Sequence, residues 1–449
     1  MTKLFATLSC SLVAISCATS ASEPSLSEID QAVTCPVPTI NVARSLAVTD
    51  PVVLAKFPLK RVMTAIAQSA LATNTPRSMY QAWMGTFANC TNSKVDPNHY
   101  GIVCPRVESQ LATIDPFALT GAHYIPVALT NRFDLAPTSG ANCGEYRIVY
   151  ALTGGPGRAF LIFESKLPNP TPTLGLAGCA PVADFWAQLS TVATATTLAA
   201  RLDAFYFTGL LAGTTQFEPV VKASHYGLSV NGGAHALGQI RTNLFANFAQ
   251  WQLREFKLTK ACASDVACPL VIDPVAVRTN PANELFAGTH ANAPAFQTSF
   301  LSHLASLQAA SAATIGLFDS VRFDEFESVS QGSDVIYRNF ATAAFKTQIA
   351  GAIKPTLTAD NILDRAETQT CAGCHQLSNN ANLGGGVTWP PSLGFVQIDE
   401  SSMLSQALIT VFLPRRAQVL TSFLTSQCTG TPVANDGLTL AGGALDAAN

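Results

Sequence analysis

Cys371-Ala372-Gly373-Cys374-His375 is the stretch of this 449-residue chain from which the rest can be interpreted. Two cysteines one helical turn apart, followed directly by a histidine, form the pattern by which a c-type haem is attached. Each thiol can add to one vinyl group of the porphyrin, and the adjacent imidazole can then bind the iron. Two other interpretations stay open. Cys371 and Cys374 could form a short disulfide, or they could bind zinc with Cys428 and a distant histidine.

A short amphipathic helix leads into this motif. Thr358 can cap the helix, and a Gly- and Asn-rich loop with the run Pro390-Pro391-Ser392-Leu393-Gly394 follows the histidine. The inward stripe of the helix comprises Ile362, Leu363 and Ala366. Because a helix delivers the Cys-x-x-Cys-His motif at its end, residues 356–428 resemble a class I cytochrome c domain. The resemblance implies a small all-α unit that carries one covalent haem c.

The same resemblance implies roles for residues around the porphyrin. Pro391 stands closest to the proline whose carbonyl accepts a hydrogen bond from the axial histidine, and Leu393 stands closest to the leucine that packs on the haem. Such a bond orients the ring and raises the basicity of the imidazole. Trp389 could lie against the haem edge or could be a structural residue of a Pro-rich turn.

The second axial ligand has several candidates. Met403 stands where the family places its distal thioether, but it could also pack in a helix over 401–413. His303 could reach the iron from outside the segment, or the sixth position could be open. Beyond Pro414, which separates two short predicted helices, Arg415 and Arg416 could pair with the haem propionates or lie in solvent.

The N-terminus has the features of an export signal. A lysine precedes an apolar run, which predicts a signal peptide over residues 1–21. Ala14-Ile15-Ser16-Cys17 is similar to a bacterial lipobox, so lipidation of Cys17 is one expectation and cleavage near Ala21 is the other. Residues 22–54 are interpreted as a polar tether. We expect an exported protein, in the periplasm or on the outer membrane, with a membrane contact through the lipid.

Composition indicates a well-packed protein in an oxidising compartment. Only 12% of residues are charged, the net charge is −3, and no basic stripe suggests nucleic-acid binding. Beyond Cys17 the chain has ten cysteines, of which eight remain if a haem takes two. Neighbouring positions suggest the disulfides Cys90–Cys104, Cys143–Cys179 and Cys262–Cys268, which leaves Cys35–Cys428 as the fourth pair.

Residues 55–355 are predicted to form an α+β domain, with an antiparallel sheet and surrounding helices. Strands are expected over 124–131, 145–152, 159–166, 238–246 and 251–258, with a bulge near Glu255. Helices are expected over 58–71, from 78, over 180–208 and 294–308, and over 333–352 with Ser333 as its cap. Arg132, Asp134, Arg147 and Glu164 could line a polar cleft or form a salt-bridged sheet edge. The haem segment follows over 356–428, and a frayed tail over 429–449.

Three functions are compatible with these features. The first is electron transfer by a mono-haem c-type cytochrome with an unknown redox partner protein. The second is a haem-dependent oxidoreductase or peroxidase-like enzyme, whose acid or base the sequence does not identify. The third is a disulfide-stapled surface lipoprotein without haem. Residues 55–355 contain no motif that assigns a substrate.

Overall fold

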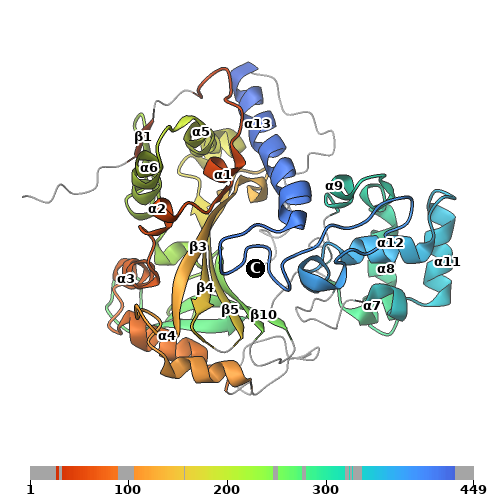
Figure 1. Cartoon of the computed structure of the whole chain (residues 1–449), viewed down its shortest axis with the longest axis horizontal. Helices are drawn as coiled ribbons and strands as arrows, with labels where there is room; N and C mark the ends of the chain where they lie inside the picture. Colours follow the sequence, from red (N-terminus) through yellow and green to blue (C-terminus); the bar gives the residue numbers. More distant parts are fainter. Residues whose placement is uncertain are drawn as a thin grey trace, which may run out of the picture.

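The structure is a computed structural model that describes residues 27–29, 33–88, 106–155, 157–245, 251–275, 280–318, 323, 326 and 336–429. The predicted signal peptide with Cys17, the Cys90–Cys104 pair, Ser333 and the tail beyond residue 429 lie outside the described residues. The described part has the predicted α+β class, with a central eight-stranded sheet and a separate group of helices beside it (Figure 1).

The central sheet is antiparallel except where β8 pairs in parallel with β10. Its strand order is β11-β10-β9-β5-β4-β3-β2, and the predicted strands are its long middle members. A small second sheet has the order β1-β6-β7. The strands are β1 Ser27–Ile29, β2 Ala47–Val48, β3 His123–Arg132, β4 Asn142–Thr153, β5 Arg158–Pro168, β6 Leu210–Ala212, β7 Thr215–Phe217, β8 Ser229–Val230, β9 Gln239–Phe245, β10 Gln252–Lys260 and β11 Leu270–Val275.

One large core joins the sheet to the helices that surround it. Trp83 of α4, for example, packs edge-on against Phe256 of β10, with ring centroids 5.5 Å apart. Residues 42–54 belong to this core and are not part of a polar tether, because Leu46, Ala47 and Val48 are buried. The helices are α1 Val42–Ser45, α2 Pro51–Leu54, α3 Leu59–Ser69, α4 Pro76–Gly85, α5 Ala180–Gln188, α6 Ala195–Phe207 and α13 Leu413–Thr429.

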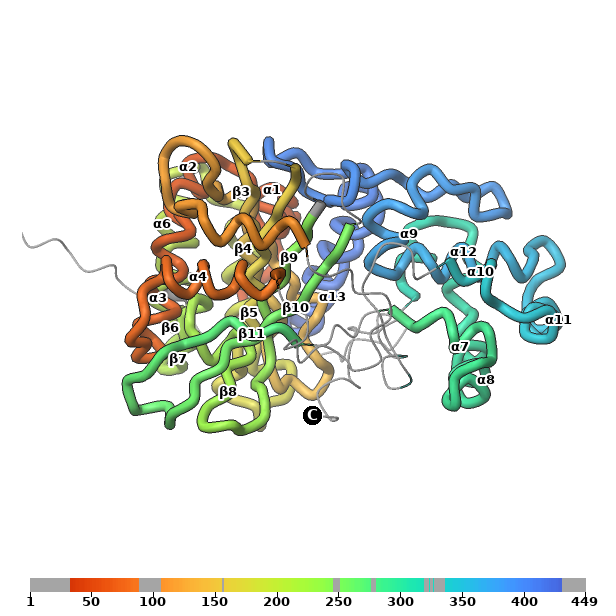
Figure 2. Tube along the Cα trace, turned by 90° about the horizontal axis from the view of Figure 1, so that it is seen from below, coloured from red at the N-terminus to blue at the C-terminus, as the bar shows by residue number. Residues whose placement is uncertain are grey.

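A second core lies in the helical group, which Figure 2 shows beside the sheet. It contains α12, the predicted helix that leads into Cys371, together with helices from before residue 355. Helix α13 packs instead on α5 in the first core, so the two cores do not divide at residues 355 and 356. The helices of this group are α7 Asn283–Ala287, α8 Ala293–Ser302, α9 Ala312–Ile315, α10 Tyr337–Phe340, α11 Ala343–Ala352 and α12 Ala359–Glu367.

Strand β10 contacts both cores, which corrects the bulge expected near Glu255. The register of β9 and β10 is continuous from Gln252 to Phe256. Trp251 and Leu253 pack in the helical core, whereas Phe256 and Leu258 pack in the sheet core. Alternate side chains of a strand point to opposite faces, so a strand buried on both faces needs no slip.

Two helix predictions are also corrected. The helix expected over 333–352 is divided into α10 and α11, because Thr342 caps α11 by accepting a hydrogen bond from Phe345 N. Pro414 does not separate two helices. Helical backbone continues from residue 406 into α13, and a wider π turn over Leu408–Phe412 precedes the proline.

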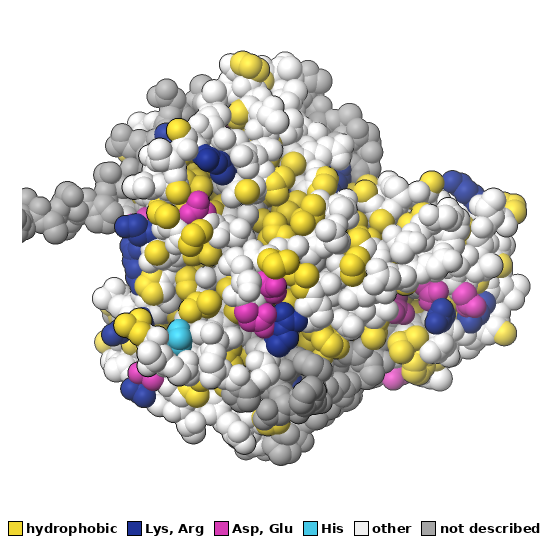
Figure 3. Space-filling view, viewed as in Figure 1, with side chains coloured by type: hydrophobic (Ala, Val, Ile, Leu, Met, Phe, Trp, Pro, Cys, Tyr) yellow, Lys and Arg dark blue, Asp and Glu magenta, His cyan; other side chains and the backbone are white. Residues whose placement is uncertain are grey.

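Three of the four expected disulfides are present, and the fourth lies outside the described residues. Cys143–Cys179 and Cys262–Cys268 close local loops, while Cys35–Cys428 ties the start of the described core to the end of α13. Charged side chains are sparse on the face shown in Figure 3, and apolar side chains gather near its middle. Among the described residues, no helix is both long enough and apolar enough to cross a membrane.

Candidate haem-attachment site

The Cys371–His375 motif lies where the two cores meet. Helix α12 carries a capping box between Thr358 and Asn361, and its buried stripe of Ile362, Leu363 and Ala366 fixes it in the helical core. The chain then turns through Gly373, where an added Cβ would lie 1.8 Å from the carbonyl oxygen of Glu367. Only glycine therefore fits between the two cysteines at this position.

The ring of His375 is held by residues of the sheet. It stacks on Trp251 with centroids 5.5 Å apart and an interplanar angle of 29°. His375 Nδ1 lies 2.9 Å from the carbonyl oxygen of Phe395, and Asn243 Nδ2 donates to that same oxygen over 2.8 Å. A carbonyl only accepts, so Nδ1 carries the proton and Nε2 keeps its lone pair.

The backbone that supplies this carbonyl has an unusual conformation. Gly394 and Phe395 have φ angles of 67° and 66°, and the left-handed region is uncommon for a bulky residue. Arg158 of β5 holds the turn in place: its Nη1 donates to the carbonyl oxygen of Leu393 over 2.6 Å and also to that of Gly394. The carbonyl oxygen of Phe395, which accepts from His375, is therefore held in place by an arginine of the sheet.

Burial controls the protonation of the motif. It lowers the pKa of His375 to about 4, so the imidazole is neutral at pH 7 and can act as a ligand. Burial, followed by the nearby Cys371, raises the pKa of Cys374 to about 12. The carbonyl oxygen and Sγ of Cys374 lie 2.9 and 3.3 Å from Gln397 Nε2. The thiol is thus kept protonated in the absence of a reaction partner.

Cys371 and Cys374 are not joined to each other, although every other described cysteine is in a disulfide. The backbone N–H of Cys371 donates to Asn280 Oδ1 over 2.6 Å, which ties the motif to the helical core. The short Cys371–Cys374 disulfide considered from the sequence is therefore not formed. Within the described ranges, no three His, Cys, Asp or Glu side chains converge as a metal site.

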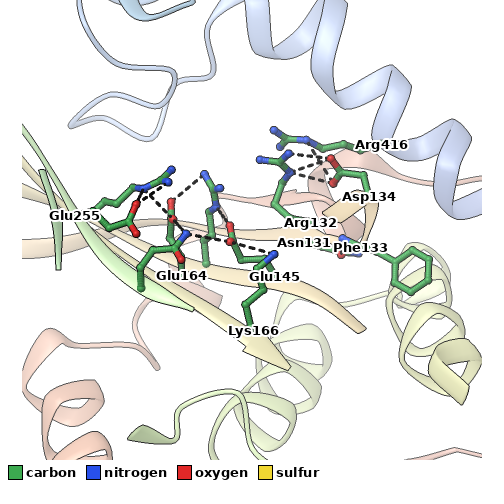
Figure 4. A network of polar contacts seen from close by, with 12 residues as sticks. Asn131, Arg132, Phe133, Asp134, Glu145, Glu164, Lys166, Glu255 and Arg416 are labelled. Atoms are coloured by element: carbon green, nitrogen blue, oxygen red, sulfur yellow. Dashed lines mark hydrogen bonds and ion pairs between the residues drawn. The ribbon is translucent and has the colours of Figure 1, made fainter. Parts of the chain in front are cut away.

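A row of charged side chains, the charged sheet face, crosses the middle of the sheet on the side of the motif (Figure 4). Arg241 of β9 lies 3.0 Å from Glu255 and 3.5 Å from Glu164. Arg147 of β4 pairs with Glu145 and Glu164 on its two sides. The full row is Arg132, Asp134, Glu145, Arg147, Glu164, Lys166, Arg241, Glu255 and Arg416. Apart from Asp134, in the turn after β3, and Arg416, in α13, these residues lie on central strands, so they are not a sheet edge.

Two arginines of the charged sheet face, Arg241 and Arg416, interact electrostatically with the cysteines of the motif. Burial lowers the pKa of Arg416 to about 9, with Arg132 adding to the effect, while Asp134 and Cys374 act in the opposite direction. Burial lowers the pKa of Arg241, but Glu164, Glu255 and then Cys371 act in the opposite direction and raise it above its usual value. Basic groups of the sheet are thus near both cysteines.

The predicted contact residues fall into two groups. Arg416 lies in the charged sheet face, 4.0 Å from Asp134, whereas Arg415 Nη1 donates to Gln418 on the surface of the same helix. Pro391 does not accept the histidine bond, because its carbonyl accepts from Ala407 N and the turn at Phe395 takes the expected role. Leu393 is half-buried against the sheet core.

The remaining candidates, Trp389, Met403 and His303, are not among the residues that hydrogen-bond to the ring of His375. Trp389 is fully buried in the helical core, 6.2 Å from Phe412 between ring centroids. Met403 is 57% exposed, and its backbone is held in a turn by Asp399. It precedes the helix in which it was expected, since helical backbone begins only at residue 406. His303 Nδ1 bonds to the carbonyl oxygen of Ser299, and its ring packs on Phe323.

Sequence reasoning missed the residues that orient His375: Asn243, Trp251 and Phe395. Trp251 was assigned to a strand face, but nothing in the sequence indicated that this face meets a segment more than a hundred residues later. No protein-family model matches the chain, and neither the curated proteins nor the solved structures contain a significant match. The site therefore has to be interpreted from its own chemistry.

Proposed function

We propose that the chain is an exported mono-haem c-type cytochrome, with one haem bound to Cys371 and Cys374 and with His375 as an iron ligand. The observation that carries the proposal is the hydrogen bond from His375 Nδ1 to the carbonyl oxygen of Phe395. This bond directs the lone pair to Nε2, and an axial histidine requires that tautomer. The haem would supply one-electron chemistry, and the protein would transfer single electrons to and from a partner protein.

The chemistry of the donors fits such a group. The two thiols are one turn apart on a backbone fixed by Gly373 and Asn280, and neither is consumed in a disulfide. Arg416, on the charged sheet face, could pair with a propionate, because a guanidinium matches a carboxylate in shape and charge. Trp251 would restrict water access to His375 by covering one face of its ring. Met403 remains a candidate sixth ligand only if its exposed side chain turns inward.

Export to an oxidising compartment accompanies this proposal. Three disulfides among the described residues favour the periplasm or the outer membrane surface, and haem c is attached outside the cytoplasmic membrane in bacteria. Whether Cys17 carries a lipid would decide between those two locations. Palmitate labelling of the wild type and of Cys17→Ala would test it.

A haem-dependent oxidoreductase is the second candidate, favoured by one specific observation. The charged sheet face lies next to the motif and contains Glu164, a buried acid whose pKa is raised by burial. An acid of this kind beside an open iron site is a requirement for peroxide chemistry. The electron-transfer function instead needs no vacant coordination position.

A reduced-minus-oxidised pyridine haemochrome spectrum of protein exported with haem-ligation machinery tests the proposal. We expect one equivalent of haem c, and a colourless protein would contradict both haem functions. Carbon monoxide added to the reduced protein separates the two. An unchanged spectrum supports electron transfer, whereas a shifted Soret band supports the enzyme.

A further inference from the structure

Asn243 of β9 lies between the indole of Trp251 and the turn at Phe395. It is 4% exposed, and its side-chain amide makes a hydrogen bond on each side. The Nε1–H of Trp251 donates to Asn243 Oδ1. An indole N–H only donates, so this bond fixes which end of the amide is the oxygen. The amide oxygen faces Trp251, and Nδ2 faces the carbonyl oxygen of Phe395.

Two donors therefore share one acceptor at Phe395. Asn243 Nδ2 donates to this carbonyl oxygen over 2.8 Å, and His375 Nδ1 lies 2.9 Å from it. The two nitrogens are 3.5 Å apart, as expected when both N–H groups point at the same oxygen. The electron density of the oxygen is divided between them, so each bond is weaker than it would be alone. The bond from Trp251 polarises the amide and makes Nδ2–H a stronger competitor.

We propose that Asn243 is a positioning residue that, together with Trp251, raises the reduction potential of the haem by weakening the bond between His375 and the Phe395 carbonyl. That bond makes the imidazole a stronger donor to iron, and a stronger donor stabilises the oxidised state. A competitor for the carbonyl therefore shifts the balance towards the reduced state. The inference rests on the proposed function, because the potential belongs to the bound haem, and it assigns control of that potential to β9.

Redox titration of the haem-loaded wild type and of Asn243→Leu tests the proposal. Leucine is close to asparagine in size but has no donor, so the competing bond is lost while water stays excluded. At one fixed ambient potential, we expect the ratio of reduced to oxidised protein to fall about two- to fivefold, since one hydrogen bond of ordinary strength is involved.

Asn169→Leu is the matched control. Asn169 is also buried, and its amide donates to the carbonyl oxygens of Gly140 and Gly175. It follows the end of β5, whereas Asn243 pairs with Phe160 near the start of that strand. The ratio of reduced to oxidised protein in this control should stay that of the wild type.

The sign of the change separates this role from a structural one. A variant that only loosens the turn would weaken the bond of His375 and raise the ratio. A raised or unchanged ratio in Asn243→Leu would therefore overturn the proposal. Because this variant leaves the Trp251 N–H without its acceptor, Asn243→Leu combined with Trp251→Phe removes both partners and replaces it should the single variant fail to fold. The same fall in the ratio is expected.

A second readout does not need the haem. In full-length protein exported without haem-ligation machinery and carrying nitrogen-15 histidine, the Nδ1–H proton resonance of His375 reports the strength of its hydrogen bond. We expect a downfield shift in Asn243→Leu and none in Asn169→Leu. If the wild type binds no haem, the proposed function fails, but this resonance still tests the competition at Phe395. A downfield shift supports it, and an unmoved resonance overturns it.

Discussion

The two faces of the central sheet differ in how their charged side chains are paired. On the side of the Cys371–His375 motif, nine charged side chains form two ion-paired groups in which each has an opposite charge nearby. On the α4 side, aromatic and aliphatic residues fill the core. There Arg254 of β10 has no hydrogen-bond partner within the described residues, and its guanidinium lies over the rings of Phe87 and Phe256. Opposite charges in an ion-paired group compensate one another, whereas a buried charge without a counter-charge lowers stability.

The largest effect is expected from removing both thiols of the motif. Cys371→Ser with Cys374→Ser should abolish covalent haem, because no thioether can form, and haem staining of a denaturing gel would measure the loss. The matched control is Cys262→Ser with Cys268→Ser, which removes a disulfide at the far end of β10. Haem retained by the motif variant, or lost equally by the control, would contradict the assignment.

Substituting one arginine on each face and comparing the stability of the two variants tests this contrast. Arg147→Met leaves Glu145 and Glu164 without their shared partner and should cost about 3–5 kcal/mol of unfolding free energy. Arg254→Met removes a buried charge that has no hydrogen-bond partner among the described residues, and it should leave stability unchanged or higher. Urea unfolding of both variants measures the difference. Similar losses in the two would mean that the faces do not differ as described.

The pH dependence of stability offers a test with a defined sign. Burial, followed by Asp364, raises the pKa of Glu367 to about 8. The folded state therefore holds a proton that the unfolded chain releases near pH 4.5, so this contribution is complete below pH 4.5 and is lost as pH rises towards 8. Glu367→Gln should add about 2–3 kcal/mol at pH 7 and little at pH 4, as measured by denaturant titration.

Glu218 serves as a control, because its pKa is shifted in the opposite direction to that of Glu367. A hydrogen bond from His225 and the neighbouring Lys222 lower its pKa to about 2, so its contribution is present above pH 4.5 and is lost as pH falls towards 2. Glu218→Gln should destabilise the protein at pH 7, by less than 1 kcal/mol because this side chain is half-exposed. A stabilising Glu218→Gln would show that local charge does not set these slopes.

The smallest effect concerns the turn that presents the Phe395 carbonyl to His375. Arg158→Met removes the donors that hold the turn, so the imidazole bond should weaken and the reduction potential should rise. Glu400→Gln removes the ion partner of Arg158 but leaves its bonds to the turn, so the potential should stay near that of the wild type. Equal potentials in both variants, by redox titration, would mean that the turn does not tune the ligand.

Sequence alone predicted the elements whose signal is local. The stripe of α12, its Thr358 cap, the middle strands and two of the disulfides follow from spacing and from neighbouring residues, whereas Cys35–Cys428 was predicted only as the pair left over. It did not predict which elements share a core, and so α13 was grouped with the wrong helices. It also gave Pro391 a role that belongs to Phe395, because a carbonyl is present at every residue and only the backbone path selects one.

Intact-mass analysis of the mature exported protein, followed by mapping of its proteolytic peptides, tests the central claim most directly. The account predicts a mass raised by one haem and a single haem-bearing peptide that contains Cys371 and Cys374. A mass without haem, with these two sulfurs joined to each other, would contradict it.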